Sequence, residues 1–145
     1  MTLKLKNQKA INKYLAQTIK RIEAALIFQL EFLVAELENH AKQSAEYEDD
    51  TSNLKSSIGG VVLKDGRPIT YRGFEGTSEG TSTGLEYINS LISDFGKGYT
   101  ILMVAGMEYA TYVENHNNLN VLKKSELRMK PELAKIFEKL KLKFK

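Results

Sequence analysis

Cysteine is absent from the 145 residues of this chain. Disulfides, thiolate zinc sites, iron–sulfur clusters and a cysteine nucleophile are therefore excluded. A chain without cysteine also suits synthesis in a reducing cytoplasm. Tryptophan is missing as well, so seven tyrosines and six phenylalanines supply all the aromatic side chains.

Long apolar runs are missing too. No segment approaches the roughly 20 consecutive apolar residues that span a bilayer, and the polar, basic start of the chain lacks the apolar core of a secretion signal. We therefore expect no membrane segment. The composition, 42% hydrophobic and 27% charged, is typical of a folded globular protein. We expect a single domain over residues 1–145 with mobile basic ends at 1–8 and 141–145.

Charge is distributed unevenly along the chain. Residues 1–22 carry six Lys or Arg and no acid, whereas residues 23–50 carry eight acids against Lys42. Residues 123–145 carry nine bases against three acids. The basic ends could bind nucleic acid, or they could bind an acidic stretch on a neighbouring copy, and both readings stay open.

The first part of the chain predicts a long helix, because apolar residues recur at steps of three and four and no Pro or Gly precedes residue 59. We expect it to run from about Gln8 to Ala45, about 50 Å in all. The rest of the chain is too short to cover it, so part of its apolar stripe should pack against another subunit. A break near 17–22 into two helices is the alternative. The stripe consists of Leu15, Ile19, Ile22, Leu26, Leu30, Leu33 and Leu37.

Two β-rich runs flank Asp65-Gly66 and predict a hairpin, because Gly supplies the positive φ of a tight turn. The first run spans Leu54–Leu63 and the second Arg67–Phe74. Pro68 lacks a donor N–H, so the second run should be an edge strand. Tyr99–Gly106 is apolar on both faces and predicts the central strand.

The Gly/Ser/Thr-rich segment Gly73–Gly84 predicts a flexible loop. Thr83 and Glu86 have the spacing of a capping box, so we expect a short helix to begin there. Gly96 and Gly98 should end that helix.

The last segment, Val121–Phe144, predicts a helix with a break near Met129–Lys130, because Pro131 suits a first helical turn. Phe137 should lie on its buried side. The elements together predict an α+β fold with a long N-terminal helix and a small antiparallel sheet formed by a hairpin plus a central strand. A short middle helix and a C-terminal helix complete it, with the helices on one face of the sheet.

No constellation of residues predicts an enzyme. The motif G-x-S-x-G occurs around Ser78 and Ser82, but the chain is too small for the sheet of an α/β-hydrolase, and composition explains the repeat. The two histidines, His40 and His116, supply too few metal ligands even beside Glu114. The Lys-rich tail lacks interleaved aromatic residues and reads as a solvated helix face. We therefore expect no catalytic residue, no cofactor and no metal.

Two segments resemble the small neck or tail-completion proteins of long-tailed bacteriophages and prophages, often labelled tail components. Residues 50–58 are similar to the family's D-T-G-x-L-x-x-S-I turn into the first strand, with Ser52 in place of Gly. Residues 109–114 are similar to the family's Y-A-x-Y-V-E, and His116 follows where the family often has Gly. The matching residues are Asp50, Thr51, Leu54, Ser57 and Ile58 in the first segment and Tyr109, Ala110, Tyr112, Val113 and Glu114 in the second.

The resemblance implies a structural virion protein of the head–tail junction that is made in the cytoplasm of the bacterial host. It implies a homo-oligomeric ring that joins other neck, portal-side and tail proteins, with at most incidental contact to DNA and none to membranes. A small basic nucleic-acid-binding module is the alternative, because both ends are rich in Lys.

The second segment has a physical reading of its own. Tyr109 and Val113 share a face at i,i+4 with Tyr112 nearby, which suits a subunit contact in which Glu114 pairs with Lys or Arg. A buried tyrosine pair that fixes the corner after the strand is the other reading.

Overall fold

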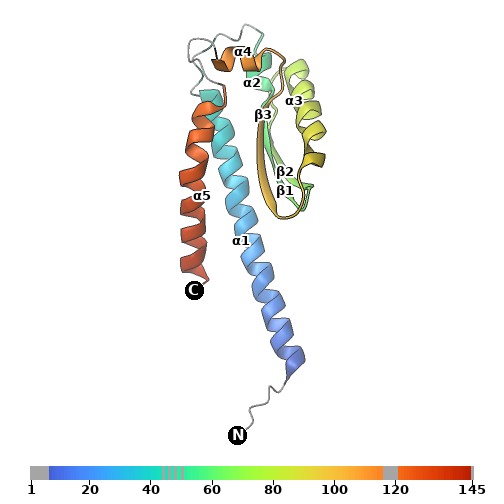
Figure 1. Cartoon of the computed structure of the whole chain (residues 1–145), viewed down its shortest axis with the longest axis vertical. Helices are drawn as coiled ribbons and strands as arrows, with labels where there is room; N and C mark the ends of the chain where they lie inside the picture. The colour runs from blue at the N-terminus through green and yellow to red at the C-terminus, as the bar shows by residue number, and fades with distance from the viewer. Residues whose placement is uncertain are drawn as a thin grey trace.

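The computed structural model describes residues 7–43, 45, 47, 49, 51–115 and 121–144. It confirms the α+β class, with a long first helix, a three-stranded antiparallel sheet, a middle helix and a C-terminal helix (Figure 1). The elements are α1 (Gln8–Gln43), α2 (Asn53–Ser56), β1 (Ile58–Lys64), β2 (Arg67–Gly73), α3 (Ser78–Leu91), the 3-10 turn η1 (Ile92–Asp94), β3 (Tyr99–Ala105), α4 (Ala110–Asn115) and α5 (Lys123–Lys143).

The strand order is β2-β1-β3, with both pairs antiparallel. The hairpin forms as expected, and Asp65 and Gly66 both have positive φ, as a tight hairpin turn requires. β2, which contains Pro68, is an edge strand. The prediction that Tyr99–Gly106 is central is wrong, because β1 lies between the other two strands. An apolar run on both faces shows that both faces of a strand are covered, and it carries no information about the strand's two edges.

Helices cover both faces of the sheet, so the prediction that they share one face is wrong (Figure 1). α1 packs on one face, where Leu30 and Val34 contact Val62. α3 packs on the other, where Ile88 joins Val61 in a buried cluster. Successive residues of β1 therefore meet different helices, which explains why this strand has no polar face.

α1 is continuous over 36 residues, so the alternative of a break near 17–22 is wrong. Its buried residues begin only at Leu30. Leu26 is partly buried against the core, but Leu15, Ile19 and Ile22 are uncovered, and Ile19 is 57% exposed. Figure 1 shows the N-terminal part of α1 projecting away from the sheet and the other helices. The helix is too long for its own chain to cover, as the sequence predicted.

α3 begins at Ser78, so the flexible loop over Gly73–Gly84 and the capping box at Thr83 are wrong. The Thr77 side chain caps the helix by accepting a hydrogen bond from the Gly80 N–H at 3.1 Å. Glycine is needed inside this helix, because a Cβ at Gly80 would lie 2.4 Å from a carbonyl oxygen of α2. The glycines of this segment therefore indicate close packing here and not a loop.

Two further boundaries differ from the prediction. The run Leu54–Leu63 starts with the helical turn α2, and its strand begins at Ile58. α5 continues through Pro131, so the break expected near Met129–Lys130 is wrong. Proline removes one helical hydrogen bond, and the packing of Met129 and Leu133 on either side of it against the cluster of Leu33 and Leu37 offsets that loss.

Phe137 is 57% exposed, so its predicted burial is wrong, and Ile136 takes the buried position beside Leu33 and Leu37. The helix extends to Lys143, so residues 141–143 form its last turn. Residues 1–6 and 145, which belong to the predicted mobile ends, lie outside the described residues.

Candidate functional site

The segment similar to the phage signature forms a corner directly after β3, as its sequence predicted. Tyr109 precedes α4, and Tyr112 and Val113 lie within that helix. Tyr112 is 66% exposed and Tyr109 is 40% exposed, so the reading of a buried tyrosine pair is wrong. Val113 is the inward member and packs against the buried cluster that includes Leu54. The corner therefore presents two tyrosines on the surface.

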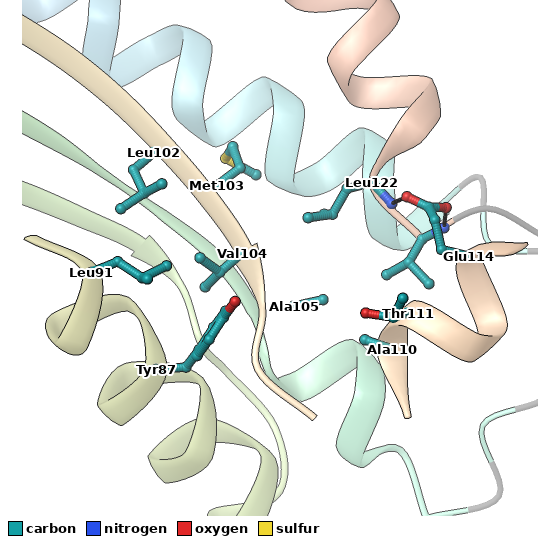
Figure 2. A pocket seen from close by; sticks show the side chains of 11 residues that line it. Tyr87, Leu91, Leu102, Met103, Val104, Ala105, Ala110, Thr111, Glu114 and Leu122 are labelled. Carbon is teal, nitrogen blue, oxygen red and sulfur yellow. Dashed lines mark hydrogen bonds between the residues drawn. The ribbon is translucent and has the colours of Figure 1, made fainter. Parts of the chain in front are cut away.

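Glu114 binds the start of α5 within its own chain. Its Oε1 accepts a hydrogen bond from the Leu122 N–H at 2.9 Å, and its Oε2 accepts one from the Val121 N–H (Figure 2). Oε1 also accepts a hydrogen bond from the Lys123 N–H at 2.9 Å. Free N–H groups at a helix start attract an anion, and a charged acceptor makes these bonds stronger. The carboxylate is thus committed to positioning α5 and is not free to pair across a subunit contact.

The first family-like segment is a capped turn. Asp50 lies outside the described residues, and the capping carboxylate belongs to Asp49, which accepts from the N–H groups of Leu54 at 3.2 Å and Lys55 at 2.8 Å. The Thr51 Oγ1 accepts a hydrogen bond from the Asn53 N–H at 3.3 Å. Ser52 has a left-handed backbone, with φ 60 and ψ 11. Glycine adopts that conformation without steric cost, so Ser52 holds a backbone that a glycine would adopt more easily.

The remaining residues of that segment are structural. Leu54, Ser57 and Ile58 are each 0% exposed. The Ser57 hydroxyl donates to the Leu54 carbonyl oxygen at 2.7 Å, and the Gly106 N–H donates to both the carbonyl oxygen and the hydroxyl of Ser57, at 3.2 and 3.1 Å. The segment therefore ties α2 to the end of β3 and fixes where the α4 corner starts.

A polar cluster that the sequence analysis did not identify joins α2 to α3. Buried Asn53 donates through Nδ2 to Glu79 Oε2 at 3.0 Å, and its Oδ1 accepts from Thr77 Oγ1 at 2.5 Å. One signal was available in the sequence: Thr77 followed by Glu79 is a capping residue with an acid in the first turn of a helix. The cluster therefore joins the start of α3 to α2.

A groove of about 250 Å³ lies between α3 and α4 along β3 (Figure 2). Among the described residues that line it, Glu114 alone is charged, and its carboxylate is already bound to α5. Small-molecule pockets typically measure about 300–1,000 Å³, so this groove is small for a metabolite. The lining consists of Tyr87, Leu91, Leu102–Ala105, Ala110, Thr111, Glu114, Val121 and Leu122.

The serine of the first G-x-S-x-G match does not lie at the turn that this motif forms in an α/β-hydrolase. Ser78 lies in the first turn of α3 and is not on a strand-to-helix elbow. Burial raises the pKa of Tyr47, and Asp49 and Glu114 nearby raise it further, so its hydroxyl stays protonated at neutral pH. Among the described residues no cluster of His, Asp and Glu could hold a metal ion.

Within the same residues, none of the helices has the length and apolar character needed to cross a membrane. Comparisons with protein-family models, with curated proteins and with solved structures find no match for this chain.

Proposed function

We propose that this chain is a structural protein of the head–tail junction of a long-tailed phage, a neck or tail-completion component that assembles into a ring through contacts between copies. The observation that carries the proposal is the uncovered apolar stripe on the projecting half of α1. The resemblance of residues 50–58 and 109–114 to the neck family supports a place for this assembly at the head–tail junction.

The stripe is a poor surface for an isolated molecule. Leu15, Ile19 and Ile22 are exposed at steps of three and four, with Tyr14 exposed beside them. Fully burying one Leu or Ile side chain contributes about 1.5–3 kcal/mol. Because these three are already partly covered, completing their burial on a neighbour would contribute about 2–4 kcal/mol in total before the cost of association. A helix that extends this far from its core is typical of a protein that completes its packing in an assembly.

The geometry favours a head-to-tail contact. The projecting half of α1 is basic, with Lys9, Lys13, Lys20 and Arg21 among its residues and no acid before Glu23. The corner around α4 carries the opposite charge, because residues 107–115 contain two acids and no Lys or Arg. A contact between two unlike surfaces forms a closed ring when the rotation between copies allows it.

The stripe can be tested in the phage or prophage that encodes the chain. Ile19→Glu places a charge on the stripe and should reduce infectious particles and the amount of this protein in virions. Gln17→Glu adds the same charge at an exposed position off the stripe and should leave both unchanged. Equal incorporation of the two variants would contradict assembly through the stripe.

Binding of nucleic acid is the competing function, since α5 exposes several cations, including Arg128, Lys130 and Lys135. Binding to phosphates would weaken steeply as salt rises. Tight, salt-dependent binding of the purified protein to DNA at physiological ionic strength, together with its absence from virions, would replace the assembly proposal.

A further inference from the structure

The two edges of the sheet are protected to different degrees. β2 carries Pro68 and the cations Arg67 and Arg72, and its pairing with β1 shifts register between Val62 and Leu63. Proline, charge and a bulge are the devices that keep an edge strand from pairing with another chain. β3, with the sequence YTILMVA, has none of them. An unprotected apolar edge is a site where a further strand can add.

The register shows which backbone groups β3 offers. The Gly106 N–H donates to the Ser57 carbonyl oxygen, and the Asp65 N–H donates to the Gly98 carbonyl oxygen. Because pairing alternates along an antiparallel ladder, every second residue of β3 points its N–H and C=O away from β1. These residues are Tyr99, Ile101, Met103 and Ala105, and their outward groups make no hydrogen bond within the part of the chain that the structure describes.

The groove of Figure 2 runs beside this edge. Tyr87 and Leu91 on α3 form one wall, and Leu122 lies on the other. A second recess of about 210 Å³ adjoins it and is lined by Met103, Leu122, Ser125, Glu126 and Met129. A strand placed beside β3 would thus bury alternate side chains in a largely apolar space.

The charge of the elements around the groove indicates what kind of strand would add to β3. Residues 78–94 and 107–115, which form α3, η1 and the α4 corner, contain five acids and no Lys or Arg. In contrast, acids of α1 are used within the chain: Glu23 pairs with Lys64 at 3.0 Å and Glu38 pairs with Lys42 at 2.6 Å. Two of the five, Glu79 and Glu114, are likewise bound within the chain, whereas Glu86, Asp94 and Glu108 are exposed. The elements that border the groove therefore carry a net negative charge, which favours a basic strand with alternating apolar side chains.

The first six residues of the chain have that pattern. They read Met-Thr-Leu-Lys-Leu-Lys, so Leu3 and Leu5 alternate with Lys4 and Lys6. A period of two is the pattern of a strand with one apolar and one charged side. The segment is also about as long as the open part of β3.

Distance decides which copy receives this segment. The edge of β3 lies beside the C-terminal half of α1, where Ile101 packs against the cluster of Leu33 and Leu37. Gln8 is 25 residues before Leu33, which corresponds to about 38 Å along the helix. Six extended residues span at most about 20 Å. The segment therefore cannot reach the groove of its own chain.

We propose that residues 1–6 of one copy add as a strand to the open edge of β3 of the next copy, with Leu3 and Leu5 in the groove. The inference rests on the proposed function in that both require self-association of this chain. In this arrangement, each copy in the ring donates residues 1–6 to one neighbour and receives the same segment of its other neighbour at β3.

The natural absence of cysteine makes cross-linking a direct test. A Leu5→Cys protein is mixed with a Leu122→Cys protein under mild oxidation, and mixed dimers are counted on a non-reducing gel. We expect about tenfold more mixed dimer than with Lys13→Cys in place of Leu5→Cys, because a docked strand raises the local thiol concentration. In hydrogen exchange, a peptide of residues 1–7 should protect the amides of Ile101 and Met103 in protein that lacks residues 2–6.

Three outcomes would overturn the inference. The first is that Lys13→Cys cross-links to Leu122→Cys as efficiently as Leu5→Cys does. The second is that a peptide that reads Met-Thr-Leu-Leu-Lys-Lys-Asn protects the amides as well as the peptide of residues 1–7. The third is that Leu122→Cys cross-links to Ile69→Cys in preference to Leu5→Cys, which would place β2 in the groove. Because the test uses purified protein, its failure would not contradict the proposed function, since a ring in the virion could form through another contact. Absence from virions with intact strand exchange would instead remove the proposed function alone.

Discussion

Replacing Glu114 tests how the corner after β3 positions the C-terminal helix. Its carboxylate accepts three backbone N–H groups from residues 121–123. A hydrogen bond to a charged group contributes about 1.5–3 kcal/mol when buried, and the charge at the helix start adds about 0.3–1 kcal/mol. Because Glu114 is only half-buried, solvent screening brings the sum for Glu114→Ala to about 2–4 kcal/mol. Glu114→Gln keeps an acceptor oxygen and should cost about half of that.

The assay is urea and thermal unfolding followed by circular dichroism. A loss of about 2–4 kcal/mol in a chain of this size lowers the Tm by about 5–12 °C. The matched control is Glu126→Ala, which removes an exposed acid from the first turn of the same helix, where it pairs with Lys123 at 3.0 Å. That change should cost no more than about 0.5 kcal/mol. If the free energies of unfolding of Glu114→Ala and Glu126→Ala fall equally, the capping role assigned to Glu114 is wrong.

Four further substitutions test a buried hydroxyl, close packing and backbone strain. Tyr47→Phe removes a buried hydroxyl that has no partner in the described part of the chain, and should raise the free energy of unfolding by about 1 kcal/mol. Burial holds the pKa of Tyr47 above its ordinary value of about 10, so this tyrosine lowers stability as pH rises past that value, and urea midpoints at alkaline pH should fall less in the variant. Gly80→Ala should cost about 1–3 kcal/mol by clash, whereas Gly96→Ala, with open space around it, should be neutral in thermal unfolding. Ser52→Gly should raise stability by up to about 1 kcal/mol, measured in urea, by relieving the left-handed backbone; a loss would contradict that strain.

Periodicity predicted α1 and its uncovered half, because the spacing of apolar residues and the length of a helix are local properties. The same kind of reasoning misplaced Tyr99–Gly106 as the central strand. Local pattern reports whether the two faces of a strand are covered, whereas the position of a strand in a sheet depends on which edges pair. The glycines of α3 led to the wrong prediction of a loop for a related reason. Gly80 allows α3 to pack closely against α2, and α2 is distant in sequence.

The candidate site was predicted in part. The corner at 109–114 and the buried Leu54, Ser57 and Ile58 lie where the sequence placed structural residues. The role of Glu114 was not foreseen, since its partners are backbone groups and leave no residue-type signature. The groove along β3 could not be predicted either, because α3, β3 and the start of α5 form it together.

Quantitative mass spectrometry of purified virions tests the central claim most directly. If the chain builds a ring at the head–tail junction, its peptides are present in several copies per particle, remain after nuclease and high-salt washing, and are lost when Ile19→Glu replaces the natural chain. Virions that lack these peptides while the protein accumulates in the infected cell would contradict the account.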